Sequence, residues 1–140
     1  PFTRAIHLTQ WDSAATANKL LYVRADVFAG TAGVRSEYRF TNFTGSFAPS
    51  ADLWVNAAGE INLFTHHNGV TTPTGVALPR GEWHQLGFAL DYSTFQVDVY
   101  YDDRRVVTQA PFTPGVTTHG ALSFSTLGAA PTSCSSTTSR

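Results

Sequence analysis

Residues 81–103 read GEWHQLGFALDYSTFQVDVYYDD, and this stretch decides the fold. Apolar and polar residues alternate along Trp83–Leu90 and again along Thr94–Tyr101, and an Asp-Tyr-Ser corner separates the two runs. A period of two residues is typical of a β-strand with one face buried and the other exposed. The stretch therefore predicts two strands joined by a short turn.

The same alternation extends in both directions from this stretch. Glycines and prolines lie between the predicted strands, which are short and regularly spaced, as in an antiparallel sandwich or closed barrel. The one predicted exception is a short helix at Asp12–Leu21, with Asp12 or Ser13 as its cap. The further predicted strands are Leu21–Ala29, Val34–Thr41, Leu53–Asn56, Glu60–His67, Arg105–Val107 and Ala121–Leu127. The sequence thus predicts an all-β protein.

Length and composition predict one globular domain with little net charge. The chain has 140 residues, of which 42% are hydrophobic and 14% charged, and its formal net charge is −1. We expect a single domain at 1–130 and a Ser/Thr-rich tail at 131–140. Nucleic acid and anionic membranes require a concentrated basic surface, so we expect neither as a partner. No apolar run reaches the ~20 residues of a membrane span, so membrane insertion is not expected.

Residues 53–107 resemble the concanavalin A-like jelly-roll superfamily, especially laminin-G-like and pentraxin-like domains. The resemblance is carried by Leu53-Trp54-Val55-Asn56, Gly59, Gly81-Glu82-Trp83-His84-Gln85-Leu86 and Val97-Asp98-Val99-Tyr100-Tyr101-Asp102-Asp103. It implies an antiparallel jelly-roll β-sandwich. Asp102-Asp103 stands where the family usually has Asp-Gly, and either pair can form a tight turn. The chain is short for the family, so peripheral strands could be missing or supplied by a neighbouring chain.

Two of the three tryptophans are predicted to lie in the interior, whereas Trp11, near the start of the sequence, could be exposed. Trp83 opens a strand whose Leu86, Phe88 and Leu90 are predicted to point inward, and burial of such side chains stabilises by roughly 1.5–3 kcal/mol each. We therefore expect Trp83, and with it Trp54, to fill the core rather than to serve as a platform for a sugar ring.

Arg35-Ser36-Glu37-Tyr38-Arg39 is the most suggestive short motif. Its two arginines and its glutamate share one face of a predicted strand. The motif is similar to the Arg-Ser/Thr-Glu-x-Arg segment of alginate-lyase-type jelly rolls, which implies an arginine that neutralises a uronate, with His66 as base and Tyr100 as acid. That family's Gln-x-His and Tyr-Phe-Lys-Ala-Gly segments are absent. The alternative is a solvated strand face with cross-strand ion pairs.

Other catalytic and metal-binding patterns are weak. Retaining glycosidases need two carboxyl groups ~5–5.5 Å apart, but the three glutamates, Glu37, Glu60 and Glu82, lie on separate segments. His66 and His67 would point to opposite faces of a strand, which disfavours a shared metal. We expect no cofactor, with calcium as the alternative left open. The residues of the right type for calcium, which could equally be turn carboxylates, are Asp52, Asn56, Asp102 and Asp103.

Two features bear on location. Asn42-Phe43-Thr44 fits the acceptor sequence for N-glycosylation, and a polar, Thr-rich chain with Lys19 as its only lysine suits an extracellular or particle surface. Cys134 is the only cysteine, so it is either an incidental free thiol or forms a disulfide bond to another chain.

The leading hypothesis is a non-catalytic extracellular recognition module that binds carbohydrate or a protein partner. Its expected ligand-binding residues are Arg35, Glu37, Arg39, His66 and Tyr100, which requires their strands to be neighbours. The alternatives are a structural subunit of a surface filament, shell or capsid-like assembly, with a homo-oligomer as partner, and a small polysaccharide lyase of alginate-lyase type. Fold alone does not choose between them.

Overall fold

The computed structural model describes residues 5–8, 20–31, 37–44, 48–115 and 119–127. In these ranges the chain forms ten strands and no helix. Within the same ranges, no helix has the length and hydropathy of a transmembrane segment. The strands are β1 (Ala5–Leu8), β2 (Leu20–Phe28), β3 (Glu37–Thr44), β4 (Pro49–Val55), β5 (Glu60–Thr65), β6 (Val70–Ala77), β7 (Trp83–Asp91), β8 (Gln96–Tyr101), β9 (Arg104–Pro111) and β10 (His119–Leu127).

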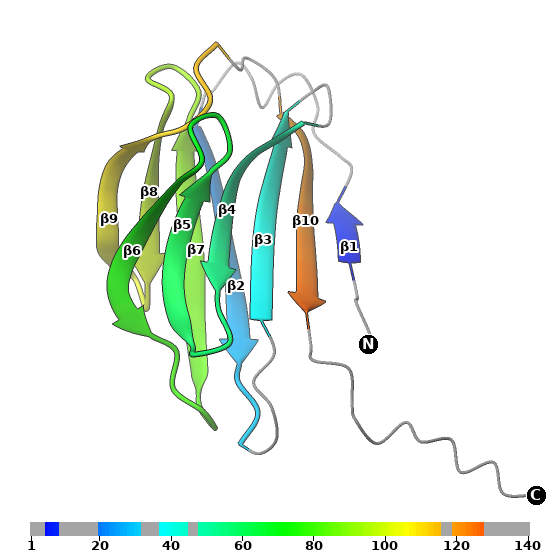
Figure 1. Ribbon diagram of the computed structural model, residues 1–140, viewed down its shortest axis with the longest axis vertical. Helices are drawn as coiled ribbons and strands as arrows, with labels where there is room; N and C mark the ends of the chain where they lie inside the picture. The colour runs from blue at the N-terminus through cyan, green and yellow to red at the C-terminus, as the bar shows by residue number, and fades with distance from the viewer. Residues whose placement is uncertain (1–4, 9–19, 32–36, 45–47, 116–118, 128–140) are drawn as a thin grey trace, which may run out of the picture.

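The strands build two antiparallel sheets that pack face to face (Figure 1). One sheet has six strands in the order β1-β10-β3-β4-β5-β6, and the other has four in the order β2-β7-β8-β9. Strands that are adjacent in sequence pair as hairpins, except where the chain crosses between the layers. The all-β, antiparallel jelly-roll sandwich predicted from the sequence is confirmed.

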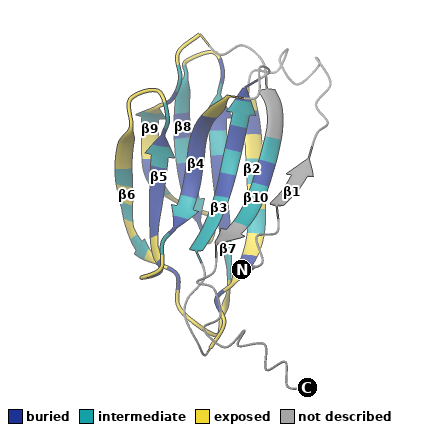
Figure 2. Cartoon of the chain, turned by 45° about the vertical axis from the view of Figure 1, so that its right-hand side comes forward, coloured by how far each residue is buried: buried dark blue, intermediate teal, exposed yellow. Residues whose placement is uncertain are grey.

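The core lies between the sheets and follows the alternation of the sequence. In β7, Leu86 and Phe88 are 1% exposed and Leu90 is 0% exposed, and Val97 and Val99 of β8 face them in register. Full burial of each such side chain stabilises the fold by roughly 1.5–3 kcal/mol. Figure 2 shows most of β4 and β5 in the colour of buried residues. The buried residues include the outward-facing Asp52 and Asn62, whereas the outward-facing Trp54 and Phe64 are only partly buried.

Three local expectations need correction or extension. Strands β1 and β6 were not predicted, and β6 contains Pro73, although the prolines were expected between strands. Proline is tolerated there because β6 is an edge strand. Of the predicted helix at 12–21, residues 12–19 lie outside the described residues and Leu20 and Leu21 belong to β2. The predicted tail at 131–140 and Cys134 also lie outside them.

The hairpin between β8 and β9 turns as expected at Asp102-Asp103. Both residues have positive φ angles, 48° and 62°, which aspartate adopts more readily than most residues. The turn therefore forms without the glycine that is usual in the similar family.

Trp83 and Trp54 point outward, so their predicted core positions are wrong. Trp83 is 70% exposed, and Trp54 is partly buried on the outer face of the six-stranded sheet. The reason for Trp83 is its spacing. Trp83 and Leu86 are three positions apart, and an odd number of positions places two side chains on opposite faces of a strand.

Candidate functional site

The outer face of the six-stranded sheet gathers charged and aromatic side chains from three adjacent strands. On each strand these residues alternate with core residues, so they point away from the sandwich. The register places Trp54 between Arg39 and Asn62, and Asp52 between Thr41 and Phe64. The face is formed by Glu37, Arg39 and Thr41 of β3, Asp52 and Trp54 of β4, Asn62 and Phe64 of β5, and His66 directly after β5.

Asp52 is the centre of this face. Its side chain is only 3% exposed, and its Oδ2 lies 3.6 Å from Arg39 Nη1 and 3.1 Å from His66 Nε2. Both contacts are within ion-pair range, but the one with His66 lacks hydrogen-bond geometry, because Nε2 has no hydrogen-bond partner. A buried carboxylate held only by such contacts is costly.

Three buried side-chain atoms of the described residues have no hydrogen-bond partner, and all three belong to this group. They are Arg39 Nε, Asp52 Oδ1 and His66 Nε2. Buried polar atoms are nearly always hydrogen-bonded in folded proteins, so exceptions that cluster at one place call for an explanation. The atoms offer one donor, one acceptor and one ring nitrogen whose role depends on the tautomer.

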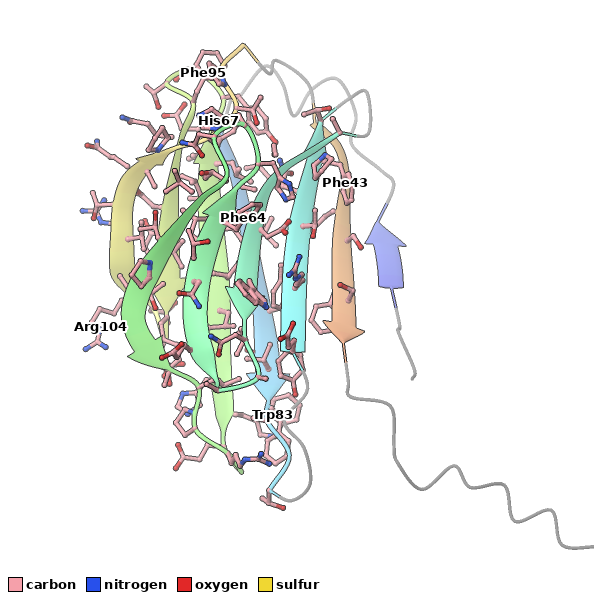
Figure 3. The ribbon with its side chains drawn as sticks, in the orientation of Figure 1. Phe43, Phe64, His67, Trp83, Phe95 and Arg104 are labelled. Atoms are coloured by element: carbon pink, nitrogen blue, oxygen red, sulfur yellow. The ribbon has the colours of Figure 1, made fainter. Side chains whose placement is uncertain are left out.

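Aromatic side chains flank the charged group. The Arg39 guanidinium lies over the Trp54 ring, with 4.9 Å between Cζ and the ring centroid, and Trp54 Nε1 donates to Glu37 Oε2 at 3.3 Å. Phe64, labelled in Figure 3, meets His66 edge to face at 4.8 Å between centroids. A hollow of about 280 Å³ beside Glu60 and Asn62 extends the face toward β6. Together these groups provide flat apolar surfaces next to hydrogen-bonding atoms.

Of the five expected ligand-binding residues, three share this face. Glu37 and Arg39 lie on β3 and His66 follows β5. Tyr100 lies on β8 of the other sheet and packs edge to face against Tyr22 at 5.7 Å. The expectation that Tyr100 joins the arginines is therefore wrong, because alternation does not reveal which sheet a strand enters. Arg35 lies outside the described residues.

Sequence reasoning missed much of the site. Asp52 was considered only for calcium, Trp54 was assigned to the core, and Asn62 and Phe64 were not selected. A signal was present, since Asp52 and Trp54 are two residues apart, as are Asn62, Phe64 and His66. Each set must share one face of its strand. The pairing of the strands was the missing information.

Asn42 is not a glycosylation site in this fold, so that prediction is wrong. Its side chain is 0% exposed. Nδ2 donates to Ser50 Oγ at 2.7 Å and to Tyr92 Oη at 3.1 Å. Asn42 therefore anchors a buried hydrogen-bond network between the two sheets and cannot present its amide to a glycan.

The residues considered for calcium do not converge. Asp52 is in the middle of the six-stranded sheet, Asn56 is in the β4–β5 turn, and Asp102 and Asp103 are in the β8–β9 turn of the other sheet. Among the residues that the structure describes, no group of three or more His, Cys, Asp or Glu side chains is arranged to hold a metal ion.

A second histidine, His84, sits in a different environment at the end of the four-stranded sheet. Its Nδ1 is 2.7 Å from Asp102 Oδ2 and its Nε2 is 3.0 Å from Glu82 Oε2. The Tyr101 ring stacks on the imidazole, and the Tyr101 hydroxyl lies 2.9 Å from Nδ1. Asp102 Oδ1 also accepts the Gln85 backbone N–H at 2.8 Å. This cluster ties the β8–β9 turn to the start of β7.

The ionisation of this cluster follows from its contacts. The hydrogen bond to Asp102 raises the pKa of His84, partial burial opposes it, and the hydrogen bond to Glu82 adds to the increase. The Gln85 N–H, followed by His84, lowers the pKa of Asp102. Burial, followed by the charge of Asp102, raises the pKa of Tyr101. These contacts therefore favour the protonated imidazole of His84 beside an ionised Asp102, with both ring nitrogens engaged.

Comparison with known proteins identifies the fold. No protein-family model matches the sequence, and no curated protein matches it. A sialidase is similar in structure, with a TM-score of 0.71 and 16% identity over 91% of this chain. This chain spans 11% of the sialidase chain.

Two further solved structures are similar. Sheep galectin-11, in complex with glycerol, has a TM-score of 0.54 and 13% identity, over 92% of this chain and 94% of the galectin. A β-glucanase from Bacillus licheniformis has a TM-score of 0.50 and 19% identity, over 81% of this chain and 55% of the glucanase. These likenesses confirm the jelly-roll fold that the sequence resemblance implied. At such identities they establish the fold alone.

Proposed function

We propose that the chain is a non-catalytic carbohydrate-binding module whose site is the outer face of the six-stranded sheet. The observation that carries this proposal is the group of Arg39, Asp52 and His66, each with a buried polar atom that lacks a hydrogen-bond partner. Both atoms are buried, so a saccharide hydroxyl would reach them only after the Arg39 side chain, which is 36% exposed, moves aside. The hydroxyl would then donate to Asp52 Oδ1 and accept from Arg39 Nε, which would satisfy both atoms at once. Such a module would act on an extracellular or particle surface, where glycans are displayed.

The charges of the face favour a neutral saccharide over a uronate. Asp52 already faces the Arg39 guanidinium at 3.6 Å, and Glu37 and Glu60 add negative charge to the same face. An anionic sugar would have to enter against these carboxylates, whereas neutral hydroxyl groups would not. The lyase mechanism considered from the sequence needs an uncompensated arginine and lacks support here.

An extended ligand fits the face better than a single sugar. Arg39 covers one face of the Trp54 ring, and Asn62 is the register neighbour of Trp54 on the opposite side. A sugar ring would pack against the free side of the indole, between Trp54 and Asn62. The hollow beside Glu60 and Asn62 would receive the next unit of an oligosaccharide.

The geometry also argues against the lyase alternative in a second way. That mechanism required His66 and Tyr100 to act on one substrate, and the two residues lie on different sheets. Among the described residues of the outer face, no tyrosine is available to replace Tyr100. Binding without catalysis is therefore the proposal that the arrangement supports best.

The test is a glycan array followed by isothermal titration calorimetry with the best neutral oligosaccharide. We expect Arg39→Ala and Trp54→Ala each to weaken binding by about tenfold or more, which corresponds to about 1.4 kcal/mol. Tyr100→Phe is the matched control on the other sheet and should leave the affinity unchanged.

Other results would refute the proposal. Loss of binding in Tyr100→Phe but not in Arg39→Ala would move the site to the other sheet. Growth of ultraviolet absorbance from unsaturated uronates with an acidic polysaccharide would indicate a lyase. Absence of glycan binding together with a large assembly in light scattering would favour a structural subunit.

A further inference from the structure

Trp83 is exposed without an evident structural need. It is 70% exposed, more than any other large hydrophobic side chain among the described residues. The register sets it opposite Phe28 on the outer face of the four-stranded sheet. Phe28 packs against the indole at 5.3 Å between centroids, with the planes tilted by 41°. The ring is therefore supported from one side and free to contact a ligand.

A polar hollow lies directly beside the indole. It has a volume of about 220 Å³ and is lined by Asp26, Trp83, His84, Gln85, Asp102 and Asp103. Gln85 Nε2 donates to Asp26 Oδ1 at 3.1 Å, which orients both side chains across the β2–β7 pair. Figure 3 shows Trp83 near one end of the molecule, well away from Phe64 on the six-stranded sheet.

The charge of the hollow is largely compensated. Asp102 is paired with His84 at 2.7 Å, and Asp103 is paired with Arg24 at 3.3 Å. Asp26 uses Oδ1 for Gln85, and its other carboxylate oxygen can accept from a ligand hydroxyl. A free indole face next to an oriented carboxylate and amide suits a polyhydroxylated ring better than a multiply charged cation, which would need uncompensated carboxylates.

We propose that Trp83, Asp26 and Gln85 form a second saccharide-binding site, in which a sugar ring packs on the indole and its hydroxyl groups bond to Asp26 and Gln85. The site lies on the four-stranded sheet and shares no residue with the face around Asp52. It does not rest on the function proposed for that face. A single chain with both sites would hold two saccharide chains at once and gain avidity toward a dense glycan surface.

Nuclear magnetic resonance can observe the two sites separately in the intact chain. The three tryptophans each give one indole N–H resonance, and Trp→Phe variants assign them. The chain is titrated with neutral gluco-oligosaccharides and galacto-oligosaccharides, and in a parallel arm with a lysine-rich peptide. We expect the Trp83 resonance to shift to saturation with a saccharide, and Asp26→Ala to weaken the binding read from that resonance by about tenfold or more.

The outcomes separate the two proposals. A saturating shift of Trp54 without one of Trp83 would overturn this inference and leave the function of the six-stranded face intact. A saturating shift of the Trp83 resonance alone would support this inference and overturn the function proposed for the six-stranded face. A response of Trp83 to the peptide but to no saccharide would overturn the inference in favour of a cationic protein partner. Because Trp83 is on the surface, its variants should fold, and circular dichroism checks this.

Discussion

Two histidine–aspartate pairs in this molecule have similar distances and different environments. His66 and Asp52 approach to 3.1 Å on the six-stranded sheet, and His84 and Asp102 approach to 2.7 Å at the end of the four-stranded sheet. Around Asp52, three buried atoms have no hydrogen-bond partner. Around Asp102, both imidazole nitrogens and both carboxylate oxygens are engaged.

We propose that the difference separates a pair that serves binding from one that serves stability. A fully bonded cluster ties strands together and rigidifies a turn. A partly bonded, buried cluster costs stability, and such costs concentrate where a protein meets a ligand. We therefore expect substitutions at Asp102 to act on folding and substitutions at Asp52 to act on recognition.

The largest loss of stability is expected from Asp102→Ala. The change removes the acceptor of the Gln85 N–H and the partner of His84, and it places alanine at a φ of 48°. Loss of hydrogen bonds to a charged group and strain in the left-handed region each cost on the order of 1–3 kcal/mol, so we expect about 2–3 kcal/mol in urea unfolding.

Asp103→Gly is the control for that substitution within the same turn. It removes only the exposed ion pair with Arg24, and glycine adopts the φ of 62° at position 103 without strain. Exposed pairs contribute about 0–1 kcal/mol, so stability should change little or rise. Equal losses in the two variants would show that the turn, and not the His84 cluster, determines the effect.

A smaller effect is expected from pH. The raised pKa of His84 means that its ion pair stabilises the fold fully below the unfolded value of 6.5 and loses this contribution as the pH rises through the folded pKa. The lowered pKa of Asp102 gives a contribution that is present above 3.8 and is lost as the pH falls through its folded pKa. The pair thus stabilises most between pH 3.8 and 6.5.

His84→Gln tests this dependence. The variant should lose the decline in unfolding free energy above pH 6.5, an effect of about 1 kcal/mol or less because Glu82 and Asp102 are partly exposed. His66→Gln is the matched control on the other sheet and should keep the decline. An unchanged pH profile in His84→Gln would contradict the assignment.

The alternation of apolar residues was sufficient for the sandwich and for most of its strands. It failed at β6, where Pro73 and Gly75 interrupt a run of threonines, because the strand forms through pairing with β5 rather than from its own composition. The alternation also implied the observed position of Trp83, because an odd separation from the buried Leu86 places Trp83 on the outer face of the sheet.

The candidate site was less accessible from the sequence. Alternation identifies which residues share a face of one strand, and so it grouped Glu37 with Arg39. It does not reveal that β3 lies beside β4 and β10, or that β8 lies beside β7 and β9 in the other layer. These pairings decide that Asp52 joins Arg39 and that Tyr100 does not, and they depend on contacts between distant parts of the chain.

The most direct test of the account is Asp52→Asn, with saccharide affinity and urea unfolding measured on the same preparation. We expect the affinity to fall by about thirtyfold or more, as for a central polar contact worth about 2 kcal/mol. The free energy of unfolding should change by less than about 1 kcal/mol, because the carboxylate is only partly bonded. Unchanged affinity with a loss of several kcal/mol in stability would contradict the account, because Asp52 would then be a structural residue.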